Sequence, residues 1–191
     1  MTTQTTSIEK KYISAQELLE ASFELALKVL DSGFRPSFIV GIWRGGTPVG
    51  IAVQELLDYF GVETDHISIR TSLYSGIGER KADIRVHGLQ YILDNINADD
   101  DLLIVDDVFD TGLSVDAVIE HLKLKARRNT PHDIRIATTY FKSANNLTER
   151  TPHYFVHETD KWLVFPHELT GLTPEEIRDN KPGIGTLADR I

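Results

Sequence analysis

Apolar positions follow two alternating patterns through the centre of the chain. Continuous apolar runs, typical of strands buried inside a parallel sheet, predict strands at residues 38–42, 102–105 and 134–140. Apolar residues at helical spacing predict helices at about residues 14–33, 48–59 and 114–125. This alternation predicts an α/β fold with a mainly parallel central sheet flanked by helices. Ligands of such sheets bind at the carboxyl ends of the strands.

The remaining segments complete the expected organisation. Strands at residues 66–70 and 84–86 flank a charged segment with two glycines, 72–82, which we expect to form a mobile loop. After residue 145 two short strands are predicted, at 154–156 and 163–165, and Thr173 begins a helix. Residues 1–10 are polar and are predicted to be a disordered tail. We expect residues 11–191 to form a single domain, with a small hood built from the N-terminal segment and the residues after about 145.

The composition excludes several classes of protein. The chain has 191 residues, a formal net charge of −9 and no cysteine. The acid excess argues against nucleic acid and anionic membranes as partners, so an anionic ligand needs local backbone donors and a few placed cations. The lack of cysteine excludes a disulfide framework, a thiolate zinc site and cysteine catalysis. Neither a signal peptide nor an apolar stretch of about 20 residues is evident, which predicts a cytoplasmic protein.

The segment at residues 106–114 combines carboxylates with a phosphate-binding helix start. Asp106, Asp107 and Asp110 follow an apolar strand, and their mutual repulsion requires a divalent cation or sugar hydroxyls that donate hydrogen bonds. The residues that open the next helix are Thr111, Gly112, Leu113 and Ser114. Their N–H groups and hydroxyls, together with the helix dipole, suit a phosphate. Carboxylates for a polyol or a metal beside amides for a phosphate describe a ribose 5-phosphate.

Two other interpretations of this segment stay open. The turn could be a plain strand-to-helix connection with aspartates as caps, although capping needs one carboxylate rather than three. The carboxylates could also form the acidic cluster of a phosphate-accepting receiver or of a metal phosphatase.

Residues 102–114 as a whole resemble the signature of type I phosphoribosyltransferases, which bind 5-phosphoribosyl 1-diphosphate (PRPP). Two hydrophobic pairs, two acidic residues, two hydrophobics and Asp-Thr-Gly-x-Ser match at all thirteen positions. The resemblance implies that Asp106 and Asp107 hold the ribose 2- and 3-hydroxyls, directly or through Mg²⁺, and that residues 110–114 cradle the 5-phosphate. In the 6-oxopurine members, the aspartate at the position of Asp110 is also the proposed base for the N7 proton of the purine.

A second glycine turn, Arg44-Gly45-Gly46, lies between a predicted strand and a predicted helix. It is similar to the pyrophosphate loop of the family, and this similarity implies a non-proline cis peptide bond between Trp43 and Arg44. Trp43 departs from the pattern, because relatives more often have a smaller or aliphatic residue there. Without the family, the segment reads as a glycine connector with an exposed arginine.

Residues 69–86 resemble the flexible lid that closes over PRPP and keeps water from the ribose. By this resemblance we expect Arg70 to contact pyrophosphate. The insertion between Tyr74 and Asp83 is not matched closely, so its residues stay unassigned. Without the family, the segment reads as a surface loop.

The resemblance also assigns residues to the purine and to the metal. Lys142 follows the predicted strand 134–140, where the purine-salvage members have a lysine that donates to the exocyclic oxygen O6. Trp162 lies in an Asp-Lys-aromatic-aliphatic segment and is expected to stack on the purine, while the main chain of Leu163 reads the base edge. Glu168 is a candidate Mg²⁺ ligand. Without the family, Lys142 reads as a surface lysine and Trp162 as a core aromatic.

Together these assignments predict Mg²⁺-dependent transfer of phosphoribosyl from PRPP to N9 of hypoxanthine, guanine or xanthine, with the hood over the base site. The alternatives are a phosphoribosyltransferase for another base, a PRPP-sensing regulator, and a phosphate-accepting receiver or metal phosphatase. The family implies a homodimer or homotetramer. A dinucleotide-type fingerprint at residues 183–188 is rejected, because it follows no strand and the chain ends too soon for a helix.

Overall fold

The computed structural model describes residues 9–74, 83–184 and 190, and the chain divides into two compact units. The larger unit is Leu19–Asp160, and the smaller unit combines Met1–Leu18 with Lys161–Ile191. The smaller unit therefore contains both chain ends, and residues 145–160 belong to the larger unit. A hood over the base site stays a prediction. Most of the predicted tail 1–10 lies outside the described residues, and Lys10 already belongs to a strand.

The larger unit is built on a six-stranded sheet with the strand order β4-β3-β2-β5-β6-β7. Its strands are β2 (Phe38–Trp43), β3 (Asp65–Tyr74), β4 (Asp83–His87), β5 (Asp101–Phe109), β6 (Asp133–Phe141) and β7 (Tyr154–Glu158). Every neighbouring pair is parallel except β3 and β4, which are antiparallel. The predicted mainly parallel α/β sheet is confirmed, and β2 and β5 at its centre are the apolar runs that predicted it.

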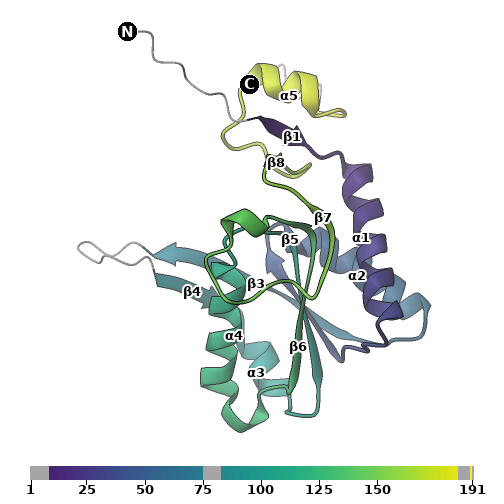
Figure 1. The fold of residues 1–191 in the computed structure, drawn as a ribbon, viewed down its shortest axis with the longest axis vertical. Coiled ribbons are helices and arrows are strands. Elements are labelled where there is room, and N and C mark those ends of the chain that lie inside the picture. Colours follow the sequence, from purple (N-terminus) through teal and green to yellow (C-terminus); the bar gives the residue numbers. More distant parts are fainter. Residues whose placement is uncertain (1–8, 75–82, 185–189, 191) are drawn as a thin grey trace. The chain divides into compact units, whose positions relative to one another are not determined.

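Helices cover both faces of this sheet (Figure 1). They are α1 (Ala15–Asp31), α2 (Gly46–Tyr59), α3 (Gln90–Asn95) and α4 (Leu113–Ala126), with short 3-10 turns η1 (Arg127–Asn129) and η2 (Ser143–Asn145). Alternate residues of β2 and β5, such as Val40 and Ile104, join the core that packs against α3 and α4. No helix within the described ranges combines the length and the apolar character needed to cross a bilayer.

Non-local pairing extends two strands beyond the apolar runs that predicted them. Strand β5 continues through the carboxylates to Phe109, because β6 runs beside it and pairs Phe109 with Phe141. Strand β3 continues to Tyr74, because β4 pairs with it and places Ser72 opposite Arg85. The expected loop 72–82 therefore begins later than predicted, and its part from 75 to 82 lies outside the described residues.

The smaller unit has a two-stranded parallel sheet and one helix. Strand β1 (Lys10–Tyr12) pairs with β8 (Trp162–Val164), and α5 is Pro174–Asn180. The helix begins with the predicted cap, since Thr173 and Glu176 form a reciprocal capping box. Glu176 also accepts hydrogen bonds from Lys10 Nζ at 2.5 Å and from Tyr12 Oη at 3.0 Å. One carboxylate therefore joins α5 to both ends of β1.

Acid should weaken the contact that Glu176 makes between α5 and β1. The hydrogen bond from Lys10, followed by those from the Thr173 N–H and from Tyr12, lowers the pKa of Glu176 to about 2. A carboxyl with a lowered folded-state pKa contributes stability above its unfolded pKa of about 4.3, and this stability is lost as the pH falls toward 2. We therefore expect β1 amides to lose hydrogen-exchange protection between about pH 4.5 and pH 2.

Two variants on α5 check this expectation. Glu176→Gln should show reduced protection of β1 already at pH 7, with the acid-dependent step removed. Asp179→Asn, which neutralises an exposed carboxylate on the same helix, should behave like the unchanged protein. An acid-dependent loss that persists in Glu176→Gln would contradict this explanation.

Candidate active site

The carboxyl ends of β2 and β5, which are neighbours in the sheet, bring together two turns that are far apart in the sequence. At the end of β5, Asp106 accepts a hydrogen bond from the Asp107 N–H at 3.0 Å, and Asp107 accepts one from the Val108 N–H at 2.8 Å. Asp107 is buried, with 7% of its surface exposed. Thr139 of β6 donates to the main-chain oxygen of Asp107 at 2.6 Å. The predicted ribose-binding pair is thus held by its own main chain and by the neighbouring strand.

The same pair has the electrostatics of a cation or polyol site. Desolvation, and next the negative charge of Asp107, raise the pKa of Asp106 well above its usual range. A bound divalent cation, or hydroxyl donors from a sugar, would relieve this unfavourable pair of charges. Mg²⁺ is commonly held by one or two carboxylates together with substrate oxygens, so Asp106 and Asp107 fit this ion. Within the described residues, no group of three or more His, Asp or Glu side chains is arranged to hold a metal alone.

The turn Arg44-Gly45-Gly46 packs directly against these carboxylates. A Cβ atom on Gly45 would lie 1.8 Å from Asp107 Oδ2, and one on Gly46 would lie 2.4 Å from the Val105 carbonyl oxygen. The main-chain N–H of Gly46 also donates a hydrogen bond to the Asp106 carboxylate. The predicted cis peptide bond between Trp43 and Arg44 is confirmed. Both glycines are therefore required by contact with β5, which the sequence alone did not reveal.

The helix start after β5 has the form of a phosphate site. Gly112 caps α4 with φ at +76°, and a Cβ atom there would lie 2.7 Å from the Phe109 ring and from Thr148 Oγ1. Gly112 makes no side-chain cap, and the Leu113 N–H donates to Thr111 Oγ1 at a long 3.5 Å. The N–H groups of a helix start of this kind can be offered to an anion. Ser114 at the helix start accepts a hydrogen bond from Thr71 Oγ1 of β3 at 3.4 Å. Thr111 and Ser114 thus flank the glycine with hydroxyls.

Asp110 lies between the predicted phosphate turn, residues 111–114, and the end of β6. Its Oδ2 is 3.2 Å from Lys142 Nζ, and its Oδ1 accepts a hydrogen bond from Asn145 Nδ2 at 2.7 Å. Lys142 is buried, with 9% of its side chain exposed, whereas Asp110 is 42% exposed. The β5–β6 pairing creates this arrangement, since the Lys142 N–H donates to the Phe109 oxygen. The sequence did not predict a role for Asn145, because nothing in the neighbouring residues marks an asparagine in a polar turn as a partner of Asp110.

Arg70 is an exposed residue of β3 and pairs in register with Trp43. It therefore lies beside the Arg44 turn, where a pyrophosphate ligand is predicted. The lid residues 75–82 lie outside the described part of the chain. A pyrophosphate role for Arg70 stays a prediction.

The other predicted site residues belong to the smaller unit. Trp162 begins β8 and exposes 54% of its surface, and Leu163 is buried and pairs in register with Lys11. Glu168 accepts a hydrogen bond from the Phe165 N–H at 2.9 Å, so it stabilises the turn after β8. The purine-stacking role of Trp162 and the metal role of Glu168 stay predictions.

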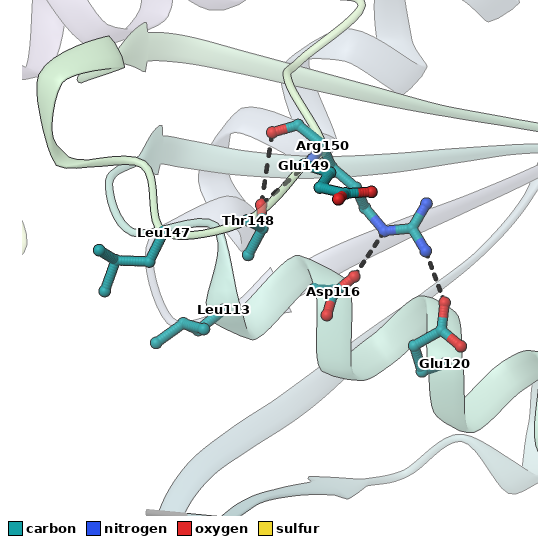
Figure 2. A pocket seen from close by; sticks show the side chains of 7 residues that line it. All are labelled: Leu113, Asp116, Glu120, Leu147, Thr148, Glu149 and Arg150. Atoms are coloured by element: carbon teal, nitrogen blue, oxygen red, sulfur yellow. Dashed lines mark hydrogen bonds and ion pairs between the residues drawn. The ribbon is translucent and has the colours of Figure 1, made fainter.

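A surface hollow of about 660 Å³ is lined by residues of α4 and of the segment 147–150 (Figure 2). None of the three carboxylates Asp106, Asp107 and Asp110 lines it. Its wall is closed by Arg150, which reaches α4 through ion pairs with Asp116 at 2.7 Å and Glu120 at 2.5 Å. Residues 147–150 therefore lie beside the start of α4, where Leu113 also lines the hollow.

A carboxylate pair, a glycine turn pressed against it and a glycine-capped helix start, at one edge of a parallel sheet, define the class of phosphoribosyltransferases. The phosphoribosyl transferase domain family matches residues 10–170. The chain belongs to this family of transferases, which confirms the resemblance seen in residues 102–114. No curated protein sequence matches the chain.

Solved structures agree with this assignment. The purine phosphoribosyltransferase from Pyrococcus horikoshii Ot3 is 27% identical, with a TM-score of 0.66, covering 87% of this chain and 98% of that one. The Helicobacter pylori xanthine-guanine-hypoxanthine phosphoribosyltransferase is 20% identical, with a TM-score of 0.63 and coverages of 82% and 92%. A hypothetical protein from Neisseria gonorrhoeae with bound ppGpp is 16% identical, with a TM-score of 0.70 and coverages of 92% and 97%. The last two establish similarity of fold.

Proposed function

We propose that this protein transfers the phosphoribosyl group of PRPP, with Mg²⁺, to N9 of a 6-oxopurine in purine salvage. The observation that carries the proposal is the pair of Asp110 and the buried Lys142, 3.2 Å apart beside the phosphate turn. A 6-oxopurine presents O6 and N7 side by side on one edge, so a lysine donor and a carboxylate acceptor match an oxygen and an N7–H group. Adenine carries an amino donor at the position of O6, which Lys142 would oppose.

Each group of site residues in the larger unit has its own role in the proposed reaction. Residues 111–114 bind the 5-phosphate, and Asp106 and Asp107 bind the ribose hydroxyls. The turn Arg44-Gly45-Gly46 and Arg70 bind the pyrophosphate. The purine N9 lone pair forms the bond to ribose C1′ as the bond from C1′ to the pyrophosphate oxygen breaks, and Asp110 accepts the N7 proton. Bound Mg²⁺ supplies charge stabilisation for the departing pyrophosphate.

The proposal includes recognition of the base by Trp162 and Leu163, and solved relatives support a purine as that base. Trp162 exposes an aromatic face of the kind that stacks on a purine, and the Leu163 main chain is assigned to the base edge. The solved relatives from Pyrococcus horikoshii and Helicobacter pylori are purine and xanthine-guanine-hypoxanthine enzymes, which supports a purine substrate here. The Neisseria gonorrhoeae protein with bound ppGpp keeps a nucleotide-binding regulator open as the second candidate.

A panel of bases tests the proposal. The protein is incubated with PRPP, Mg²⁺ and guanine, xanthine, hypoxanthine, adenine or uracil, and pyrophosphate release and nucleotide formation are measured. We expect turnover with at least one 6-oxopurine and none with adenine or uracil. Turnover with adenine or uracil alone would reject the base assignment. Calorimetric binding of PRPP without turnover on any base would favour the regulator.

A further inference from the structure

The segment that follows Lys142, residues 143–150, touches the phosphate turn at successive positions. Asn145 donates to Asp110, the Leu147 N–H donates to the Thr111 oxygen at 3.0 Å, and Thr148 lies against Gly112. Further along, Arg150 forms its ion pairs with the first turns of α4 (Figure 2). We call residues 143–150 the support segment. It connects the proposed base-binding lysine to the proposed phosphate turn.

Asn145 of this segment and Lys142, which precedes the segment, hold different oxygens of the same carboxylate. Lys142 Nζ is on Oδ2 at 3.2 Å, and Asn145 Nδ2 is on Oδ1 at 2.7 Å. The two donors differ in kind, because Lys142 has a long side chain with a charge that a purine oxygen can attract. Asn145 is short and neutral, and its main-chain N–H is bonded to the Lys142 oxygen at 3.1 Å in the turn η2. Asn145 is thus the donor fixed by local structure.

We propose that Asn145 is a positioning residue of the transfer reaction, an inference that rests on the proposed function. When Lys142 donates to O6 of the base, Oδ2 of Asp110 loses its partner and becomes free to accept the N7 proton. Asn145 keeps its hydrogen bond to Oδ1 throughout, so the carboxylate cannot rotate away from the purine edge. Asn145 itself exchanges no proton and touches no reacting atom.

The first test is a split between turnover and PRPP affinity. With the base that reacts fastest, Asn145→Ala should lower kcat by about 10-fold, the equivalent of one hydrogen bond to a charged group, and leave the KM for PRPP within about twofold. Asn145→Asp should lose more, because a second carboxylate would repel Asp110 at the same distance. Asn95→Ala, which removes an exposed asparagine from α3, is the matched control and should retain the full rate.

A second variant on the support segment separates positioning from loss of structure. Arg150→Ala removes both ion pairs to α4 without touching Asp110, so it should raise the KM for PRPP more than it lowers kcat. If Asn145→Ala instead gave this pattern, its role would be only structural and the inference would be overturned.

A double-mutant cycle completes the test. If Asn145 acts only through Asp110, the variant carrying both Asp110→Asn and Asn145→Ala should turn over as slowly as Asp110→Asn alone. Full additivity of the two losses, or an unchanged kcat in Asn145→Ala, would overturn the inference and leave the proposed function standing. No turnover by the unchanged protein on any base would reject the proposed function and, with it, this inference.

Discussion

Replacing Asp110 with asparagine is expected to lower kcat by about 100- to 10,000-fold, the range supplied by a positioned general base. Asparagine has nearly the same shape, but it cannot accept the proton that leaves N7 when N9 bonds to the ribose. The proposed phosphate ligands in residues 111–114 are main-chain amides and hydroxyls, which the substitution leaves in place. Steady-state kinetics, combined with calorimetric titration of PRPP in the presence of Mg²⁺, will measure the two effects separately.

The contrast between the two measurements decides the role of Asp110. We expect PRPP affinity to change by less than about fivefold, since a lost hydrogen bond at a partly exposed group costs about 1 kcal/mol. Asp94→Asn, which removes an exposed carboxylate from α3, is the control for the change in net charge and should affect neither quantity. Equal losses in turnover and in PRPP binding would refute a base role and make Asp110 a phosphate ligand.

The parts of this protein that could be predicted from the sequence are those encoded by neighbouring residues. Residues 38–42 of β2 and 102–105 of β5 are all buried and carry no polar side chain, so each run is visible without any partner. The turn 106–114 is likewise contiguous, so its three carboxylates and its glycine could be interpreted together. The capping box at Thr173 was predicted for the same reason, because its two members are three residues apart.

The elements that the sequence did not predict depend on contacts between residues that are far apart in the chain. Strand β1 contains two lysines and a tyrosine, and it is a strand because β8 pairs with it some 150 residues later. Helix α3 has six residues, and of these only Ile92 is buried, so a helical stripe was too short to detect. The hydrogen bond between Asn145 and Asp110 likewise depends on the pairing of β5 with β6. Sequence patterns record burial, but they do not record which polar groups two adjacent strand ends bring together.

The sequence predicted one property of the glycine turn 44–46 but did not explain another. Its similarity to a pyrophosphate loop was evident, and the cis bond at Arg44 followed from it. The reason for its two glycines was not evident, because the atoms they must avoid belong to β5, some 60 residues away. Gly45 faces the side chain of Asp107, whereas Gly46 faces the main chain of Val105 and Asp106. The two positions should therefore respond differently to the same added methyl group.

Gly46→Ala is expected to be the most disruptive single substitution in the site. Its Cβ atom would lie 2.4 Å from the Val105 carbonyl oxygen and 2.9 Å from Asp106 Cα, and neither atom can rotate away. Overpacking of this kind costs about 1–3 kcal/mol, which for a chain of this size lowers the melting temperature by roughly 2 to 12 °C. Because relief requires β2 and β5 to separate at the carboxylates, PRPP binding should be lost together with stability.

Two other glycines provide the comparison. The three atoms nearest to a Cβ on Gly45 all belong to the Asp107 side chain, which can rotate more easily than main chain can move. We therefore expect Gly45→Ala to lose PRPP binding with a smaller fall in melting temperature than Gly46→Ala. A Cβ atom on Gly50 of α2 would lie 3.8 Å from Gly41 Cα, which is ordinary contact. Gly50→Ala should therefore melt at the same or a slightly higher temperature with full activity, since alanine favours helix. The order of stability should therefore be Gly50→Ala, Gly45→Ala and then Gly46→Ala. If Gly46→Ala bound PRPP normally, the turn would not be held against β5 in the way that its close contacts require.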